Sequence, residues 1–189
     1  LTAAIDARFA VRVVKWISSA HSMGGLDARY AIAHGLAPRV ASLTTIGTPH
    51  LGTPIADIGT GLLGDTLGLR KLARVLGLDV DAFWELTQKR MAAANVALAD
   101  VRGVAYASVV GACSSTSAVH PLLALTHKYL SATAGENDGL VPAASQRWGD
   151  VLRTVDADHW AQIGWSKRRA FDVAALYLDV VKELAARGF

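Results

Sequence analysis

Apolar residues gather in short runs along the chain, and the spacing of these runs predicts strands that alternate with helices. Four runs have the length and apolar character of buried strands, at residues 11–20, 40–46, 104–111 and 151–155. Lys15, Ser18 and Ser19 make the first run more polar than a strand covered on both faces should be. Each of the other three runs ends in a turn or loop, where parallel sheets carry their functional residues.

The segments around and between these strands have apolar residues at helical spacing. It predicts the end of a helix at residues 2–10, a helix at 23–34 that Gly35 ends, and a last helix at 169–186. Residues 55–100 are mostly helical in pattern and unusually rich in large apolar side chains. Alternation of strands and helices predicts an α/β fold with a mostly parallel sheet flanked by helices.

Composition limits the classes of protein that this chain can be. With 189 residues, of which 52% are hydrophobic, we expect one domain over residues 1–189. The net charge is only +3, and no basic run interleaved with aromatic residues argues for a nucleic-acid partner. No apolar run is long enough for a transmembrane segment. The single cysteine, Cys113, excludes a disulfide within the chain and favours a packed thiol over a nucleophile.

A serine follows the first predicted strand in a setting typical of a nucleophile. Ser22 has the small residue Ala20 two positions before it and Gly24 two positions after it, and a predicted helix begins next to it. Such a serine can sit on a sharp turn between strand and helix that exposes its hydroxyl. The helix dipole then favours negative charge that develops nearby. By composition alone the spacing arises in roughly one chain in seven of this size, so the partners of Ser22 decide its meaning.

A serine hydroxyl needs a base to take its proton, and we expect His159 to be that base. His159 directly follows the fourth predicted strand, on a loop at a carboxyl end. The other five histidines fit less well. His21 adjoins Ser22 and should point away from it, His34 ends a helix, His50 suits a pocket wall, and His120 and His127 lie in a segment without an acidic loop nearby.

The base needs a carboxylate to orient it, and Asp138 is the first candidate. It lies in the tight turn Asn137-Asp138-Gly139, although a solvated turn aspartate is an equal alternative on this pattern alone. Asp158 is the rival, but a residue next to His159 in an extended loop should project to the other side. The order Ser22, Asp138, His159 is the order of α/β-hydrolases.

Four ordered blocks of the sequence closely resemble the bacterial triacylglycerol lipases of the α/β-hydrolase superfamily and their relatives among bacterial and fungal esterases. The blocks are AHSMGGLDAR at residues 20–29, TTIGTPHLG at 44–52, NDGLVP at 137–142 and DH at 158–159. The resemblance implies an α/β-hydrolase fold and a carboxylic-ester hydrolase with Ser22, Asp138 and His159 as nucleophile, acid and base.

Two features depart from the family pattern. Calcium-binding members carry an aspartate two residues after the catalytic histidine, where this chain has Ala161, so we expect no metal and no cofactor. The family also has an upstream His-Gly loop that donates one N–H of the oxyanion hole, together with the first strands of the sheet. Nothing before Ser22 supplies these, and the chain begins at Leu1, so we expect an N-terminally truncated domain in which Met23 N–H is one donor and the second is missing.

The apolar segment 55–100 fits a helical cap or lid over an acyl-binding cleft. Helices that simply pack into the core are an equal alternative.

The leading prediction of function is a lipase or esterase that acts on a lipid or small ester through an acyl-enzyme. An acyltransferase would use the same triad, and a catalytically weak fragment that binds lipid or a partner chain is a further alternative. A bare edge on the strand at 11–20 predicts self-association. The sequence carries no visible signal peptide and does not distinguish a cytoplasmic from a secreted protein.

Overall fold

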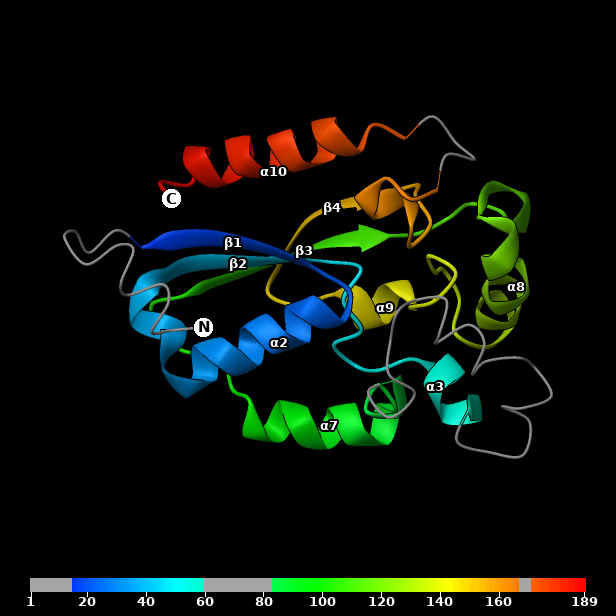
Figure 1. Cartoon of the computed structure of the whole chain (residues 1–189), viewed down its shortest axis with the longest axis horizontal. Helices are drawn as coiled ribbons and strands as arrows, with labels where there is room; N and C mark the ends of the chain where they lie inside the picture. The colour runs from blue at the N-terminus through cyan, green and yellow to red at the C-terminus, as the bar shows by residue number, and fades with distance from the viewer. Residues whose placement is uncertain (1–14, 60–82, 167–170) are drawn as a thin grey trace.

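The computed structural model of the chain describes residues 15–59, 83–166 and 171–189. Their centre is a sheet of four parallel strands in the order β1-β2-β3-β4 (Figure 1). The strands are β1 (Trp16–His21), β2 (Val40–Ile46), β3 (Ala105–Gly111) and β4 (Asp150–Val155). Because all four run the same way, their carboxyl ends lie at one edge of the sheet. The prediction of an α/β fold with a parallel sheet is confirmed.

The strand predictions hold for β2 at both ends and for β3 and β4 to within one residue. The prediction for the first strand is wrong in its bounds. Lys15 precedes β1 and is exposed, the strand continues to His21, and residues 11–14 lie outside the described residues. Burial alternates along β1, with Ile17 partly open to solvent. Lys15 and the two serines are therefore compatible with this strand because it is not buried on both faces.

Helices connect the strands and follow the last of them. They are α2 (Met23–Ala31), α3 (Pro54–Gly59), α7 (Gln88–Ala97), α8 (Ala124–Thr133), α9 (Ala143–Gln146) and α10 (Val173–Ala186). After α2 the chain continues in irregular helical turns at Ile32–Leu36 and Ala37–Arg39, and Gly35 has φ of 114°. Only glycine adopts such a φ without strain, so Gly35 interrupts these helical turns. Helix α2 itself ends at Ala31, three residues before the predicted end.

The sheet is packed between helices on its two faces. Helix α10 covers one face, and α2 and α7 lie on the other side (Figure 1). Leu176, Val180 and Leu184 of α10 pack on Ile46 and Val109 in one buried cluster. On the α2 side, a second cluster joins Ile32 to Val40 and Leu43 of β2.

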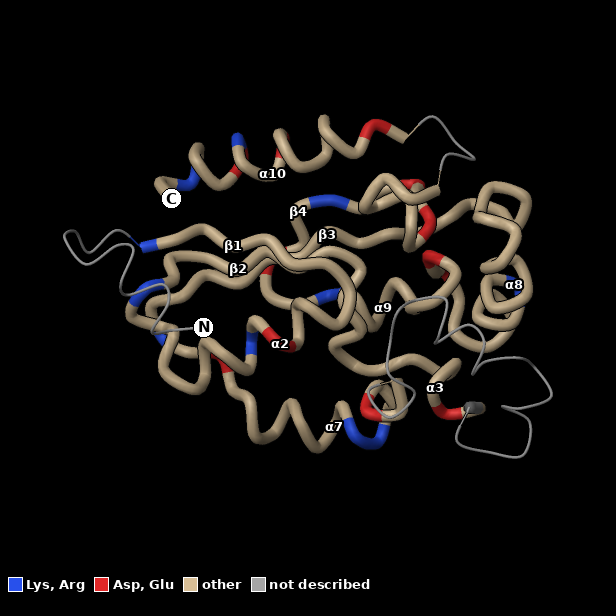
Figure 2. Tube along the Cα trace, in the orientation of Figure 1, with Lys and Arg blue, Asp and Glu red and all other residues tan. Residues whose placement is uncertain are grey.

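Helix α10 begins four residues later than predicted. It starts at Val173 because the Asp172 carboxylate accepts the N–H of Ala175 and caps the helix. Phe171 precedes the helix, and residues 169 and 170 lie outside the described residues. Arg153 of β4 pairs with Asp179 and Glu183 of α10, where charges of both signs lie close together (Figure 2).

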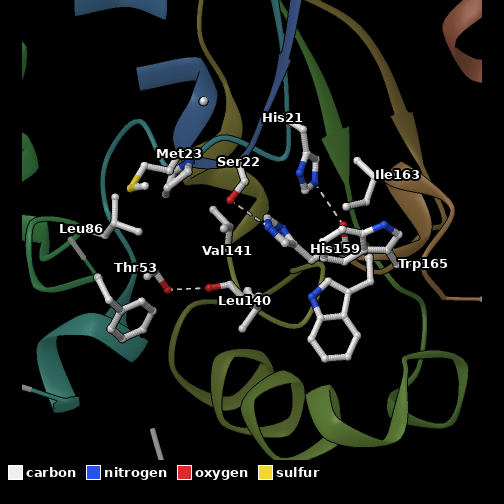
Figure 3. A pocket seen from close by; sticks show the side chains of 14 residues that line it. His21, Ser22, Met23, Thr53, Leu86, Leu140, Val141, His159, Ile163 and Trp165 are labelled. Atoms are coloured by element: carbon white, nitrogen blue, oxygen red, sulfur yellow. Dashed lines mark hydrogen bonds between the residues drawn. The ribbon is translucent and has the colours of Figure 1, made fainter. Parts of the chain in front are cut away.

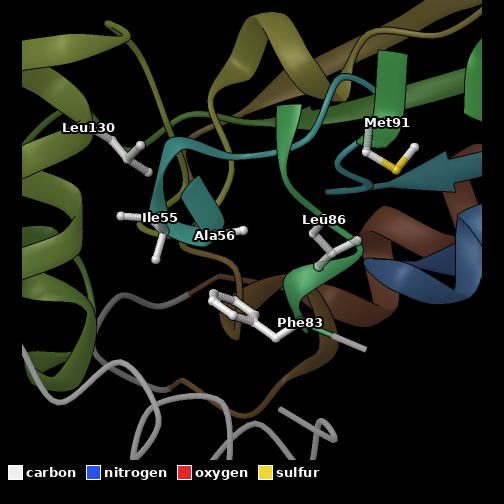
Figure 4. Close-up of a cluster of buried hydrophobic side chains, with 6 residues drawn as sticks. All are labelled: Ile55, Ala56, Phe83, Leu86, Met91 and Leu130. Carbon is white, nitrogen blue, oxygen red and sulfur yellow. The ribbon is translucent and has the colours of Figure 1, made fainter. Parts of the chain in front are cut away.

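The predicted cap at 55–100 is helical at both of its described ends, in α3 and α7. Residues 60–82 lie outside the described residues. Six residues form the buried cluster that joins these ends to α8 (Figure 4), namely Ile55, Ala56, Phe83, Leu86, Met91 and Leu130. The segment thus contributes to the core, and its role as a cap stays a prediction.

Strand β1 forms one edge of the sheet among the described residues. Self-association through this edge stays a prediction. None of the described helices is both long and apolar enough to cross a bilayer.

Candidate active site

Ser22 occupies a strained turn between β1 and α2. Its φ of 54° and ψ of −135° make it the one described non-glycine residue with positive φ. The turn is fixed by neighbouring β2, because Ser22 N–H donates to the carbonyl of Ile46 at 2.9 Å and Thr48 Oγ1 donates to the carbonyl of Ser22 at 2.8 Å. A Cβ at Gly25 would lie 2.2 Å from Thr48 Oγ1, so this contact requires glycine there.

His159 faces the hydroxyl of Ser22 from the loop after β4. Its Nε2 lies 2.9 Å from Ser22 Oγ (Figure 3). Its backbone N–H donates to the carbonyl of Asp138 at 2.8 Å. The side chain is buried. With Nδ1–H directed at a carboxylate, Nε2 is left as an acceptor for the Ser22 proton.

Asp138 lies behind His159 and is completely buried. Its Oδ1 accepts the N–H groups of Leu140 and Val141 at 3.0 and 2.8 Å. Its Oδ2 accepts His159 Nδ1–H at 2.8 Å and Gln162 Nε2–H at 3.1 Å. Four donors thus compensate a carboxylate that no water reaches, and they fix its direction.

Asp158, the rival acid, is also buried but is engaged elsewhere. Its Oδ1 accepts the N–H groups of Trp160 and Ala161, and its Oδ2 accepts the N–H of His120 and the hydroxyl of Ser166. Of the two candidate acids, Asp138 is therefore the one that the structure places on the His159 ring. The expectation that no acidic loop lies near His120 is wrong, because Asp158 binds its backbone.

His21 has a position that the sequence reasoning missed. From its place on the turn we expected its side chain to point away from that of Ser22, and we did not expect a contact with His159. Its ring instead lies 4.5 Å from the ring of His159, and its Nε2–H donates to the carbonyl of His159 at 3.0 Å. Burial lowers the pKa of His21 to about 3, with His159 adding to the effect, so His21 is neutral at ordinary pH. The one feature of the sequence that could have indicated this position is that His21 directly precedes Ser22.

The loop at residues 47–52 contributes Pro49 to the wall of the cavity at Ser22, whereas the His50 side chain does not line that cavity. His50 is fully buried, accepts Arg29 Nη1–H at Nδ1 and stacks on Trp148 at 5.1 Å. Its Nε2 lies 2.9 Å from Thr45 Oγ1. Burial lowers the pKa of His50 to about 3, and the charge of Arg29 adds to this.

Other predicted candidates lie away from the Ser22 hydroxyl. His34 stacks on Tyr30 on the surface. His127 contacts Thr116 and the carbonyl of Cys113, and Cys113 itself is buried in an apolar cluster, as a packed thiol should be.

A cavity of about 220 Å³ opens in front of Ser22. Its walls are mostly apolar and come from several elements, including Phe83 and Leu86 of the predicted cap segment and Trp165, which is largely exposed (Figure 3). Met23 is the first residue of α2, so its N–H is among those without a partner inside the helix. Its role as an oxyanion donor stays a prediction. The site can therefore hold an apolar group beside an oriented hydroxyl.

Within the described residues, no group of three or more histidine, cysteine or acidic side chains is arranged to hold a metal ion.

Comparisons with known proteins agree on the kind of protein. No family model matches the chain. Triacylglycerol lipase 2 of Saccharomyces cerevisiae is 31% identical over 191 residues, which span 90% of this chain and 57% of that lipase. A triacylglycerol lipase of Pseudarthrobacter phenanthrenivorans is 42% identical over 84 residues, covering 43% of this chain and 25% of the relative.

The solved structure of the Bacillus licheniformis lipase BlEst2 in its mature form has a TM-score of 0.69 and 26% identity, covering 86% of this chain and 64% of that chain. Fold and relatives together define the α/β-hydrolase fold. Within that superfamily, the chain is similar to lipases and esterases. It spans less than two thirds of the length of these relatives.

The buried His50 makes stability depend on pH. Its pKa is about 3 in the folded chain against 6.5 in the unfolded one, so the unfolded state binds the extra proton. We expect the free energy of unfolding to fall as pH drops from 6.5 toward 3, with His50 contributing at most about 1.4 kcal/mol per pH unit. Urea unfolding between pH 7.5 and 4 measures this slope. His50→Gln should flatten it, whereas the exposed His34→Gln should not; equal slopes in all three proteins would contradict the prediction.

Proposed function

We propose that this protein is a carboxylic-ester hydrolase that works through an acyl-enzyme formed on Ser22. The observation that carries the proposal is the continuous chain of contacts from Ser22 Oγ to His159 Nε2 and from His159 Nδ1 to Asp138 Oδ2. Similarity to lipases and esterases supports the same chemistry. A fluorophosphonate probe tests the proposal directly: it should label Ser22, and a peptide map without a label there would refute it.

In the proposed mechanism Ser22 Oγ attacks the ester carbonyl while His159 Nε2 takes its proton. Asp138 keeps His159 in the tautomer with the proton on Nδ1 and stabilises the imidazolium that forms. His159 then gives the proton to the leaving alcohol, and the acyl group stays on Ser22. Water, deprotonated by His159, attacks this ester, releases the acid and restores Ser22.

Charge on the carbonyl oxygen develops near the start of α2. The N–H of Met23 is the donor that we assign to it, and the helix dipole adds to its effect. The turn at Ser22 is followed directly by Met23 and Gly24, and all three residues line the cavity.

We propose that the substrate is a lipid or a small ester with an apolar acyl group. Leu140 and Val141 from the Asp138 turn and Phe83 and Leu86 from the candidate cap supply apolar walls to the cavity. Thr53 Oγ1 donates to the carbonyl of Leu140 at 2.6 Å and holds this wall in place. An apolar cavity favours the acyl chain of an ester over a charged or strongly hydrated group.

The three proposed catalytic residues should act as a unit. We expect Ser22→Ala, His159→Ala and the double variant each to lose kcat for ester hydrolysis by a similar factor of about 10⁴ to 10⁶, because the groups share one step. Steady-state kinetics on a chromogenic ester measures the three losses. Substantial activity in Ser22→Ala would mean that another residue is the nucleophile.

Asp138 and Asp158 provide a matched pair for the acid. Asp138→Asn should lower kcat by about 10⁴, because an amide at that place favours the wrong tautomer of His159. Asp158→Asn should affect melting temperature more than turnover, since Asp158 binds the loop rather than the ring. Kinetics and thermal melts of both variants check this. A larger loss of kcat in Asp158→Asn would transfer the role of the acid to Asp158.

We propose that the His159 loop needs no calcium. Ala161 offers no side-chain ligand, and Asp158 already ties the loop together through Trp160, Ala161 and Ser166. A chelator such as EDTA should therefore leave both melting temperature and ester hydrolysis unchanged. A fall in either quantity that added calcium reverses would indicate a metal site.

A further inference from the structure

Gln162 reaches the carboxylate of Asp138 from beyond the predicted site. It lies three residues after His159, in the short turn Ala161–Ile163, and is completely buried. Its Nε2–H donates to Asp138 Oδ2 at 3.1 Å, the same oxygen that accepts His159 Nδ1–H at 2.8 Å. The oxygen that orients His159 is thus shared between the imidazole and one amide.

Two glycines at the carboxyl ends of β2 and β3 make room for this amide. A Cβ at Gly47 would lie 2.4 Å from Gln162 Oε1, and a Cβ at Gly111 would lie 2.0 Å from Gln162 Nε2. Any side chain at either position would push the amide away from Asp138. The carboxyl ends of β2 and β3 therefore accommodate the Gln162 side chain as well as Asp138.

The amide of Gln162 is only half satisfied. Its Oε1 is buried without a hydrogen-bond partner in the structure, which costs stability that an apolar side chain of similar length would not cost. Turning the amide over would bring Oε1 against Asp138 Oδ2 and set two acceptors against each other. The donor is consequently directed at the carboxylate, and packing alone does not account for a glutamine here.

We propose that Gln162 is a positioning residue that holds Asp138 Oδ2 in line with His159 and shares its negative charge. The proposal rests on the function proposed above for Ser22, His159 and Asp138. A hydrogen bond to a carboxylate disperses its negative charge. Gln162 therefore weakens the electrostatic stabilisation that Asp138 gives to protonated His159. The other ring against His159 is His21, whose pKa of about 3 leaves it uncharged, so Asp138 is the charged group that His159 contacts.

The test replaces the donor and follows His159 itself. In Gln162→Met the full charge of Oδ2 acts on His159, so an NMR titration of its imidazole nitrogens should shift to higher pH by about half a unit to one unit. Because Asp138 also loses one restraint, kcat should fall by about three- to tenfold while KM changes little. Gln162→Glu should donate like the wild type only while its new carboxyl group is protonated. Once ionised, this group adds a second negative charge beside Asp138, so the His159 titration should move to higher pH than in the wild type.

Gln146 is the matched control. It is also fully buried and binds through its amide, but its partners are the backbone of Gly111 and the carbonyl of Val141 rather than a carboxylate. Gln146→Met should lower stability and leave the His159 titration where it is in the wild type.

An unshifted His159 titration in Gln162→Met, or an equal shift in Gln146→Met, would overturn the proposal. If Gln162→Met does not fold, Gln162→Glu decides, since a second carboxylate beside Asp138 must raise the midpoint if the contact exists. The titration needs no turnover. A chain that hydrolyses no ester would refute the proposed function, while the titration would still decide the role of Gln162.

Discussion

A buried negative charge at Asp138 is the constraint on which the site depends. A carboxylate without access to water is tolerated only where donors replace the water, and Asp138 has four of them. Each donor must be held in place by the segment of the chain to which it belongs. Two come from the turn that follows Asp138, and the other two come from the loop after β4, which must therefore lie against this turn. The parallel sheet makes this arrangement possible because the carboxyl ends of its strands, and the loops that follow them, lie at the same edge.

The strained turn at Ser22 is held by the same edge of the sheet. Its positive φ is unfavourable for a serine, and the contacts with the carbonyl of Ile46 and the hydroxyl of Thr48 stabilise it from β2 and the residues that follow. Gly47 lies between these two contacts and leaves space for Gln162. One short segment after β2 thus fixes the nucleophile on one side and accommodates the partner of the acid on the other.

Local patterns in the sequence predicted much of the fold and the three central residues. The run at 40–46 carries no charged residue and became β2 with the predicted bounds. The predicted start of α10 was wrong because the cap at Asp172 depends on one side-chain contact. His50 and Gln162 carried no local signal. The side-chain hydrogen-bond partners of these two residues lie between 5 and 24 residues away along the chain. Only the folded arrangement therefore reveals that His50 is structural and that Gln162 touches the acid.

The two buried aspartates show why sequence alone left the acid open. In each, Oδ1 accepts the N–H groups two and three residues further on, at Leu140 and Val141 for Asp138 and at Trp160 and Ala161 for Asp158. The local turns are the same, so turn chemistry cannot separate them. The difference lies in Oδ2, which for Asp158 accepts the N–H of His120 and the hydroxyl of Ser166, and for Asp138 accepts the side chains of His159 and Gln162. Whether an aspartate in this fold can orient the base therefore depends on the partners of its Oδ2. Substitutions among the residues around Asp138 Oδ2 are consequently the most direct way to alter the chemistry of the site.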